Sequence, residues 1–194
     1  LAGGLPVIAI DIDEQRLALS RKLGIQEVVN GTDTARLKKI IEGLPGGGVP
    51  VVIEVTGVRQ PVEQALDIVG LRGRVVLLGT THGNETVQFH RALSMKGASM
   101  IGGYINSKPW SMSQTNVEMP TWPPSLAPGS KRYVGPNMWT SDEDVRVVMN
   151  LIRYGSLDLR PLITHRFTPE QAPGAYQQVI DQDRSLVGGV IRWK

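Results

Sequence analysis

Residues 7–12, VIAIDI, form an almost continuous apolar run in which β-branched side chains dominate. A run of this kind is typical of a strand that is covered on both faces, as the strands of parallel sheets are. Asp13 behind it is a suitable N-cap for a helix, and Gly24 is a suitable residue for that helix to end on. The start of the chain therefore predicts a buried strand followed by a helix.

The same alternation continues outward from this stretch. Further strands are expected at residues 27–29, 51–55, 74–79 and 99–104. Helices are expected between them, one over residues 37–44, where apolar residues recur at helical spacing, and one that opens at Pro61. Strands that alternate with helices specify a parallel sheet with right-handed crossovers. The predicted fold class is α/β, a Rossmann-type doubly wound and mostly parallel sheet.

The alternation breaks between about residues 105 and 140, which hold six prolines and three tryptophans. Prolines at this density prevent regular strand pairing, while tryptophans imply that the segment packs against something. We interpret residues 105–140 as an irregular insertion within a single partial dinucleotide-binding domain that spans residues 1–194.

The C-terminal part returns to regular elements. A helix is expected from Ser141 to Gly155, and another from Thr168, where Gln171 stands at the spacing of a capping box. LVGGVIRW, residues 186–193, is expected to close the chain as a strand.

Composition excludes several classes of function. The 21 basic residues are spread along the chain among 18 acidic ones, so we expect no nucleic-acid partner. The longest apolar runs, such as residues 75–78, are far shorter than the roughly 20 residues of a membrane span. The chain has no cysteine, which excludes disulfides and thiolate zinc sites and fits a reducing, cytoplasmic location.

The histidines do not suggest a metal site. His82, His90 and His165 stand far apart and show no paired ligand spacing. Neither a Walker-type loop nor a Gly-x-Ser-x-Gly elbow is present in the sequence.

Asp11 is the most informative single position. It stands at the carboxyl end of the first expected strand, where the ligands of open α/β sheets bind, and a carboxylate there can accept both ribose hydroxyls of an adenine nucleotide. Because it would repel a 2′-phosphate, it favours NAD over NADP. The alternative is that Asp11 is a helix cap or a surface acid. Arg16, one turn into the helix, is placed either to lie against the adenine or to be a solvated side chain.

The nucleotide interpretation leaves the phosphate-binding turn unassigned. In a dinucleotide fold that glycine turn precedes the acid by about 20 residues, and only ten residues precede Asp11. The turn and the first strand would therefore lie upstream of Leu1. Gly43 and the glycines at 46–48 precede a strand instead of opening a helix, so we interpret them as a flexible turn.

Four stretches together resemble a known family. They are VIAIDIDEQRLALSRKLG at 7–24, VIEVTG at 52–57, GRVVLLGT at 73–80 and GSLDLRPLITHRFTPEQAPGAY at 155–176. In this order they are similar to the coenzyme-binding part of the medium-chain, zinc-type alcohol dehydrogenases. The resemblance implies an NAD(P)-dependent oxidoreductase of alcohols, polyols or related carbonyls.

The resemblance also implies roles for particular residues. Asp11 matches the family's ribose-binding acid and Arg16 the basic residue placed against the adenosine. Thr56 and Gly57 match the loop on the adenosine side of the cofactor, and Gly79 and Thr80 match the loop that approaches the nicotinamide. In such enzymes the strand equivalent to 99–104 pairs with its copy in a second subunit, which implies a homodimer.

Departures from the family limit what the chain is expected to do. The family's catalytic zinc ligands and proton relay belong to a separate domain that nothing here matches, so we expect no zinc in this chain. Without the first strand, the strands at 7–12 and 51–55 would each keep one unpaired edge. Gly188 and Gly189 stand where many relatives place a basic residue near the cofactor phosphates. We therefore expect weak or partial NAD binding and no catalysis by the chain alone.

Two other interpretations stay open. The chain is alternatively a non-catalytic interaction module, derived from a dehydrogenase, that self-associates through its sheet edges. It is also interpretable as one piece of a longer enzyme.

Overall fold

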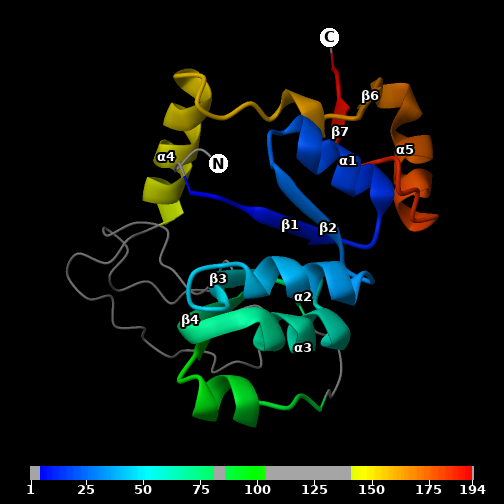
Figure 1. The fold of residues 1–194 in the computed structure, drawn as a ribbon. Helices are drawn as coiled ribbons and strands as arrows, with labels where there is room; N and C mark the ends of the chain where they lie inside the picture. The colour runs from blue at the N-terminus through cyan, green and yellow to red at the C-terminus, as the bar shows by residue number, and fades with distance from the viewer. Residues whose placement is uncertain (1–4, 81–85, 104–140, 194) are drawn as a thin grey trace, which may run out of the picture. The chain divides into compact units, whose positions relative to one another are not determined.

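The structure is a computed structural model that describes residues 5–80, 86–103 and 141–193 (Figure 1). The chain divides into two compact units, the first drawn from residues 1–37 and 146–194 and the second from residues 38–145. The insertion expected at 105–140 lies outside the described residues.

The first unit begins with the elements predicted from residues 7–24. They are β1 (Ile8–Asp11), α1 (Glu14–Lys22) and β2 (Glu27–Asn30), and the two strands pair in parallel. Asp13 is the N-cap of α1, because its carboxylate accepts hydrogen bonds from the backbone N–H groups of Gln15 and Arg16 at 2.9 and 3.1 Å. Gly24 follows the helix with φ +91°, the left-handed conformation that glycine adopts without strain. The predicted cap and stop are thus confirmed.

The C-terminal part of the first unit is less regular than expected. Its elements are α4 (Ser141–Arg153), which lies across the division between the units, β6 (His165–Phe167), α5 (Ala172–Ile180) and β7 (Gly189–Ile191). The capping box at Thr168 is confirmed, with its N–H donating to Gln171 Oε1 at 2.9 Å, although it opens a short 3-10 turn, Pro169–Gln171, that leads into α5. The closing strand is three residues long, and its parallel partner β6 was not predicted.

A close main-chain contact at Gly188 precedes the short closing strand. The Gly188 carbonyl accepts hydrogen bonds from the N–H groups of Thr164 and His165 at 2.9 and 3.1 Å. A Cβ atom added at Gly188 would lie 2.4 Å from the carbonyl oxygen of Leu162, so no side chain fits there. Gly188 therefore has a local packing reason in this chain.

The second unit contains a three-stranded parallel sheet in the order β3-β4-β5. The helix α2 (Thr34–Glu42) lies across the division between the units. The elements that follow it in the second unit are β3 (Val49–Glu54), α3 (Arg59–Ile68), β4 (Val69–Leu77), a π-helix (His90–Met95) and β5 (Ser99–Gly102). Apolar residues of α3, β4 and the π-helix form its core: Val62, Ala65, Leu66, Val69, Val75 and Ala92. This unit confirms the parallel α/β fold class.

All three strands of the second unit have boundaries that differ from the prediction: β3 covers Val49–Glu54 where 51–55 was expected, and β4 covers Val69–Leu77 where 74–79 was expected. β4 starts at Val69, five residues before the expected 74, because α3 ends at Ile68 and Val69 pairs at once with Val49 across an irregular register. β5 ends at Gly102, although the N–H of Gly103 still donates to the Leu77 carbonyl at 2.8 Å.

The pairing of β1 and β3 agrees with the expectation that each has an unpaired edge. Within the described ranges β1 pairs only with β2, and β3 pairs only with β4. Along β3 and just after it, Val51, Ile53 and Val55 are 47%, 59% and 65% exposed. Apolar side chains beside open backbone groups favour association with another strand.

In the part of the chain that the structure describes, no helix combines the length and the hydropathy that crossing a membrane requires.

Candidate functional site

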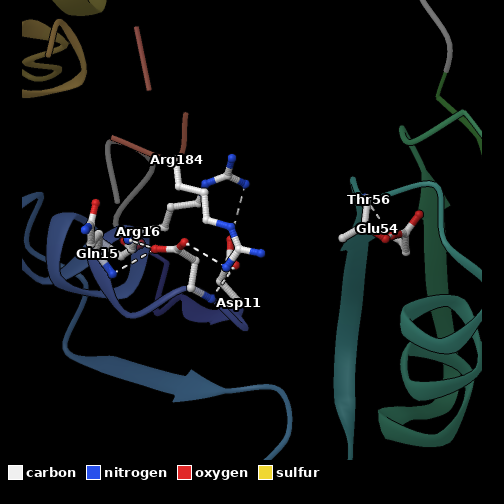
Figure 2. Close-up of polar contacts among 8 residues, drawn as sticks. Asp11, Gln15, Arg16, Glu54, Thr56 and Arg184 are labelled. Atoms are coloured by element: carbon white, nitrogen blue, oxygen red, sulfur yellow. Dashed lines mark hydrogen bonds and ion pairs between the residues drawn. The ribbon is translucent and has the colours of Figure 1, made fainter. Parts of the chain in front are cut away.

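Asp11 lies where the sequence placed it, at the carboxyl end of a strand that has a parallel neighbour. Its Oδ1 atom accepts a hydrogen bond from the N–H of Asp13 at 3.0 Å (Figure 2). Its Oδ2 atom lies 4.0 Å from Nη1 of Arg16, too far for a hydrogen bond, and the side chain is 34% exposed. The carboxylate thus supports the local turn with one oxygen and keeps accepting capacity on the other, while the helix cap itself is Asp13.

Two arginines lie near the turn that follows Asp11, Arg16 from α1 and Arg184 from the C-terminal part of the chain. The guanidinium of Arg16, half exposed, faces Asp11, and Nη1 of Arg184 lies 3.6 Å from Oδ2 of Asp13 (Figure 2). The backbone N–H of Arg16 lowers the pKa of Asp13, and the N–H of Gln15 and the charge of Arg184 lower it further. Arg184 had no signal in the sequence, because a residue so distant along the chain is brought to Asp13 only by the tertiary fold.

In the second unit, Glu54 occupies the end of β3 and organises the loop behind it. Its side chain is buried, with 4% of the residue exposed, and it accepts hydrogen bonds from the N–H of Thr56 at 2.7 Å, from the Thr56 hydroxyl, and from the N–H of Gly57 at 3.3 Å (Figure 2). The Thr56 hydroxyl in turn accepts from the N–H of Val58 at 3.1 Å. Glu54 is part of the family-like VIEVTG stretch, yet the sequence analysis gave it no role. The sequence signal that could have identified Glu54 is an acid at the end of an otherwise apolar strand.

The loop after β3 lies directly against the loop after β4. Gly57 has φ +68°, and a Cβ atom there would lie 2.3 Å from the carbonyl oxygen of Thr80. A Cβ atom at Gly79 would lie 2.2 Å from the nitrogen of Gly57. The structure therefore brings Thr56, Gly57, Gly79 and Thr80 together, main chain against main chain. The family resemblance assigned the two loops to the adenosine and nicotinamide sides of the cofactor and did not predict this contact.

The glycines at 43–48 form a turn, but a packed one. Gly46 and Gly47 have φ +80° and +67°. Gly48 is buried, and a Cβ atom there would lie 2.4 Å from Cα of Gly70. These residues lead into β3 and open no helix, so they lack the helix N-terminus that completes a pyrophosphate site. The prediction of a merely flexible turn missed the contact of Gly48 with Gly70.

Among the described residues, no three or more His, Cys, Asp or Glu side chains gather as metal ligands. His165 lies with Nδ1 3.0 Å from the Thr164 hydroxyl, and its ring stacks on Phe167 at 5.9 Å between centroids. His82 lies outside the described residues.

Comparison of the sequence with known proteins gives a consistent result. Residues 1–119 match the family model described as zinc-binding dehydrogenase. L-threonine 3-dehydrogenase of Pyrococcus horikoshii is 26% identical over 166 residues, which cover 86% of this chain and 38% of that protein. The chain thus spans about two fifths of the length of this curated relative.

Solved structures show the same fold. The 2R,3R-butanediol dehydrogenase of Bacillus subtilis superposes with a TM-score of 0.68 at 17% identity, covering 96% of this chain and 43% of that one. An alcohol dehydrogenase of Escherichia coli CFT073, solved in complex with the cofactor NADH, superposes with a TM-score of 0.66 at 15% identity, covering 96% and 44%.

Proposed function

This chain belongs to the zinc-binding dehydrogenase family, and on that premise we propose that it binds the adenosine part of a nicotinamide cofactor, NAD in preference to NADP, through the carboxylate of Asp11. The supporting observation is the position of that carboxylate at the carboxyl end of a parallel strand. Within the described residues its Oδ2 atom has the 4.0 Å ion pair with Arg16 and accepts no hydrogen bond. A carboxylate there accepts ribose hydroxyls and repels a 2′-phosphate. Arg16, half exposed beside it, is proposed to contact the adenosine.

The remaining cofactor residues belong to the second unit. Thr56 and Gly57 are proposed to face the adenosine side of the cofactor, and Gly79 and Thr80 its nicotinamide side. Their support is the family resemblance together with the main-chain contact between the two loops. The NADH complex of the E. coli relative supports a nicotinamide cofactor.

We propose that these residues are the coenzyme-binding part of an NAD(P)-dependent oxidoreductase of alcohols or related carbonyls and that they do not catalyse the reaction alone. Hydride transfer needs a bound nicotinamide beside a polarised alcohol or carbonyl. The family assigns the polarising zinc to a part of the protein that these 194 residues do not match. The absence of cysteine supports a cytoplasmic location.

Calorimetric titration of the chain with AMP and with NAD tests cofactor binding. We expect AMP to bind, with little further affinity for NAD, and 2′-AMP to bind more weakly than AMP. Asp11→Ala should weaken AMP binding about tenfold or more, because hydrogen bonds to a charged acceptor are worth about 1.5–3 kcal/mol.

Asp67→Asn, on the exposed end of α3, is the matched control and should bind AMP like the wild type. If the wild-type chain binds neither AMP nor NAD, the proposal is wrong.

Exposed apolar side chains on one face of β3, together with its unpaired backbone edge within the described ranges, favour a second candidate function, self-association. Val51, Ile53 and Val55 are exposed beside a strand whose pairing, within the described ranges, lies on one side only. The family resemblance adds β5 as a second edge for a homodimer.

Light scattering should show a dimer or larger species that Ile53→Lys converts to monomer. Met95→Lys, at another exposed apolar position, should leave it unchanged. A wild-type monomer at high concentration contradicts self-association.

A further inference from the structure

Glu54 is a buried acid that the proposed function does not yet use. Burial of a carboxylate is costly unless hydrogen bonds replace its lost hydration. Three donors meet this side chain, and all three come from Thr56 and Gly57 in the loop directly behind it. The acid is therefore matched to the loop and not to a distant charged partner.

The same residue also holds the neighbouring loop, through its main chain. The carbonyl oxygen of Glu54 accepts hydrogen bonds from the N–H groups of Leu78 and Gly79 at 2.8 and 3.1 Å. Its side chain and its backbone thus bind the two loops that press together at Gly57 and Gly79. A change in the carboxylate will act on the position of Gly57 against the second loop.

We propose that Glu54 is a positioning residue for the nucleotide, which it serves by fixing the Thr56–Gly57 loop against the Gly79–Thr80 loop. This inference rests on the proposed function, since it assumes that the two loops contact the cofactor. Glu54 itself is buried and acts through the loop.

The hydrogen-bond pattern also fixes what Thr56 offers to a ligand. Its hydroxyl has one hydrogen, which it donates to Glu54, and it already accepts from the N–H of Val58. Toward a nucleotide the hydroxyl can therefore only accept, through its remaining lone pair. It suits a ligand donor such as a ribose hydroxyl or an amino group.

AMP titration of Glu54 variants tests the inference. Glu54→Gln keeps the shape of the side chain but turns one acceptor into an N–H donor that faces other donors. We expect AMP affinity to fall about tenfold, because a buried donor left without an acceptor costs about as much free energy as a tenfold change in affinity. Glu63→Gln, which changes an acid paired with Arg59 on the surface of α3, should leave AMP affinity unchanged.

A double-mutant cycle distinguishes positioning from general destabilisation. If Glu54 acts through Thr56, the variant Glu54→Gln with Thr56→Val should bind AMP no more weakly than the weaker single variant, and Thr56→Ser should bind like the wild type. Additive losses would overturn the inference. So would a Glu54→Gln protein that unfolds at lower urea but, while folded, binds AMP with unchanged affinity.

The remaining outcomes are also decisive. If Glu54→Gln does not fold, Glu54→Asp replaces it in the test. This variant keeps the charge but is shorter by one methylene, so it should bind AMP more weakly than the wild type. An affinity equal to that of the wild type overturns the inference. A wild-type chain that does not bind AMP overturns the proposed function and this inference together. Wild-type binding that Glu54→Gln leaves intact overturns this inference alone.

Discussion

Three acids at or near strand ends behave differently although they look alike in the sequence. Asp11 is one third exposed and keeps accepting capacity, Asp13 is consumed by capping α1, and Glu54 is buried and consumed by its loop. The differences follow from the number of N–H donors that each local backbone presents. Of the three, Asp11 alone is the residue for which we propose direct contact with a ligand.

The capping role of Asp13 makes a pH-dependent contribution to stability. Its pKa lies below the ordinary 3.8, chiefly because the backbone N–H of Arg16 donates to it. The folded state therefore binds this proton less tightly than the unfolded state, so the contribution is complete above the ordinary pKa and is lost as pH falls through the lowered one. We expect Asp13→Ala to have a lower urea midpoint than the wild type at neutral pH. On acidification the midpoint of the variant should fall by less than that of the wild type.

Asp13→Asn is the control for this prediction. Asparagine caps a helix about as well but does not titrate, so its midpoint should match the wild type at neutral pH and fall less steeply in acid. Identical pH profiles for the wild type and the asparagine variant would refute the assigned origin.

At the residue scale, the sequence was sufficient where the signal was local. The position of Asp11 at the end of a strand was predicted from the apolar run that leads to it, and the structure confirms that position. The contact of Thr56 and Gly57 with Gly79 and Thr80 was not predicted. Glu54 was overlooked although it stands in a motif of that resemblance. The contact of Arg184 with Asp13 depends on tertiary structure and left no local trace.

At the scale of elements, caps and stops were predicted well because they depend on neighbouring residues. Asp13, Thr168 with Gln171, and the positive-φ glycines Gly24 and Gly155 all lie at the expected helix boundaries. Short strands were predicted poorly. β6 and β7 have three residues each, which is too few to reveal an alternation of apolar and polar side chains. Each is stabilised by its pairing with the other.

The contact of Gly48 with Gly70 gives a prediction at this scale. A Cβ atom at Gly48 would lie 2.4 Å from Cα of Gly70, and main chain at the base of β3 and β4 cannot move aside as a side chain can. We expect Gly48→Ala to lower the free energy of unfolding by about 1–3 kcal/mol, the usual cost of overpacking, measured by urea titration.

Gly102→Ala is the matched control in the same sheet. Among the residues that the structure describes, none lies within 4 Å of a Cβ atom built at Gly102, and its φ is not positive. Its stability should stay at or above that of the wild type, and a loss as large as that of Gly48→Ala would contradict the steric explanation.

At the scale of the whole molecule, the parallel α/β class followed from the order of the elements. The parallel pairing of β1 with β2, of β3 with β4 and of β4 with β5 bears it out. Which edges stay unpaired was inferred from the family's strand order and not from any local pattern. The part of the prediction that concerned residues 105–140 lies outside the described residues.

The proposal of cofactor binding without catalysis is tested on the whole chain. With NAD and a panel of alcohols, we expect no formation of NADH by the 194-residue chain, because nothing in it matches the family's zinc-bearing part. A full-length zinc-type alcohol dehydrogenase serves as the positive control in the same absorbance assay. Zinc-dependent turnover by this chain would contradict the prediction.

The glycine contact between the loops after β3 and β4 has a consequence for engineering. Since Gly57 and Gly79 leave each other no space and Glu54 bonds to both sides, neither loop can be redesigned alone without disturbing the other. A substitution within residues 54–57 will therefore need compensating changes within residues 78–80.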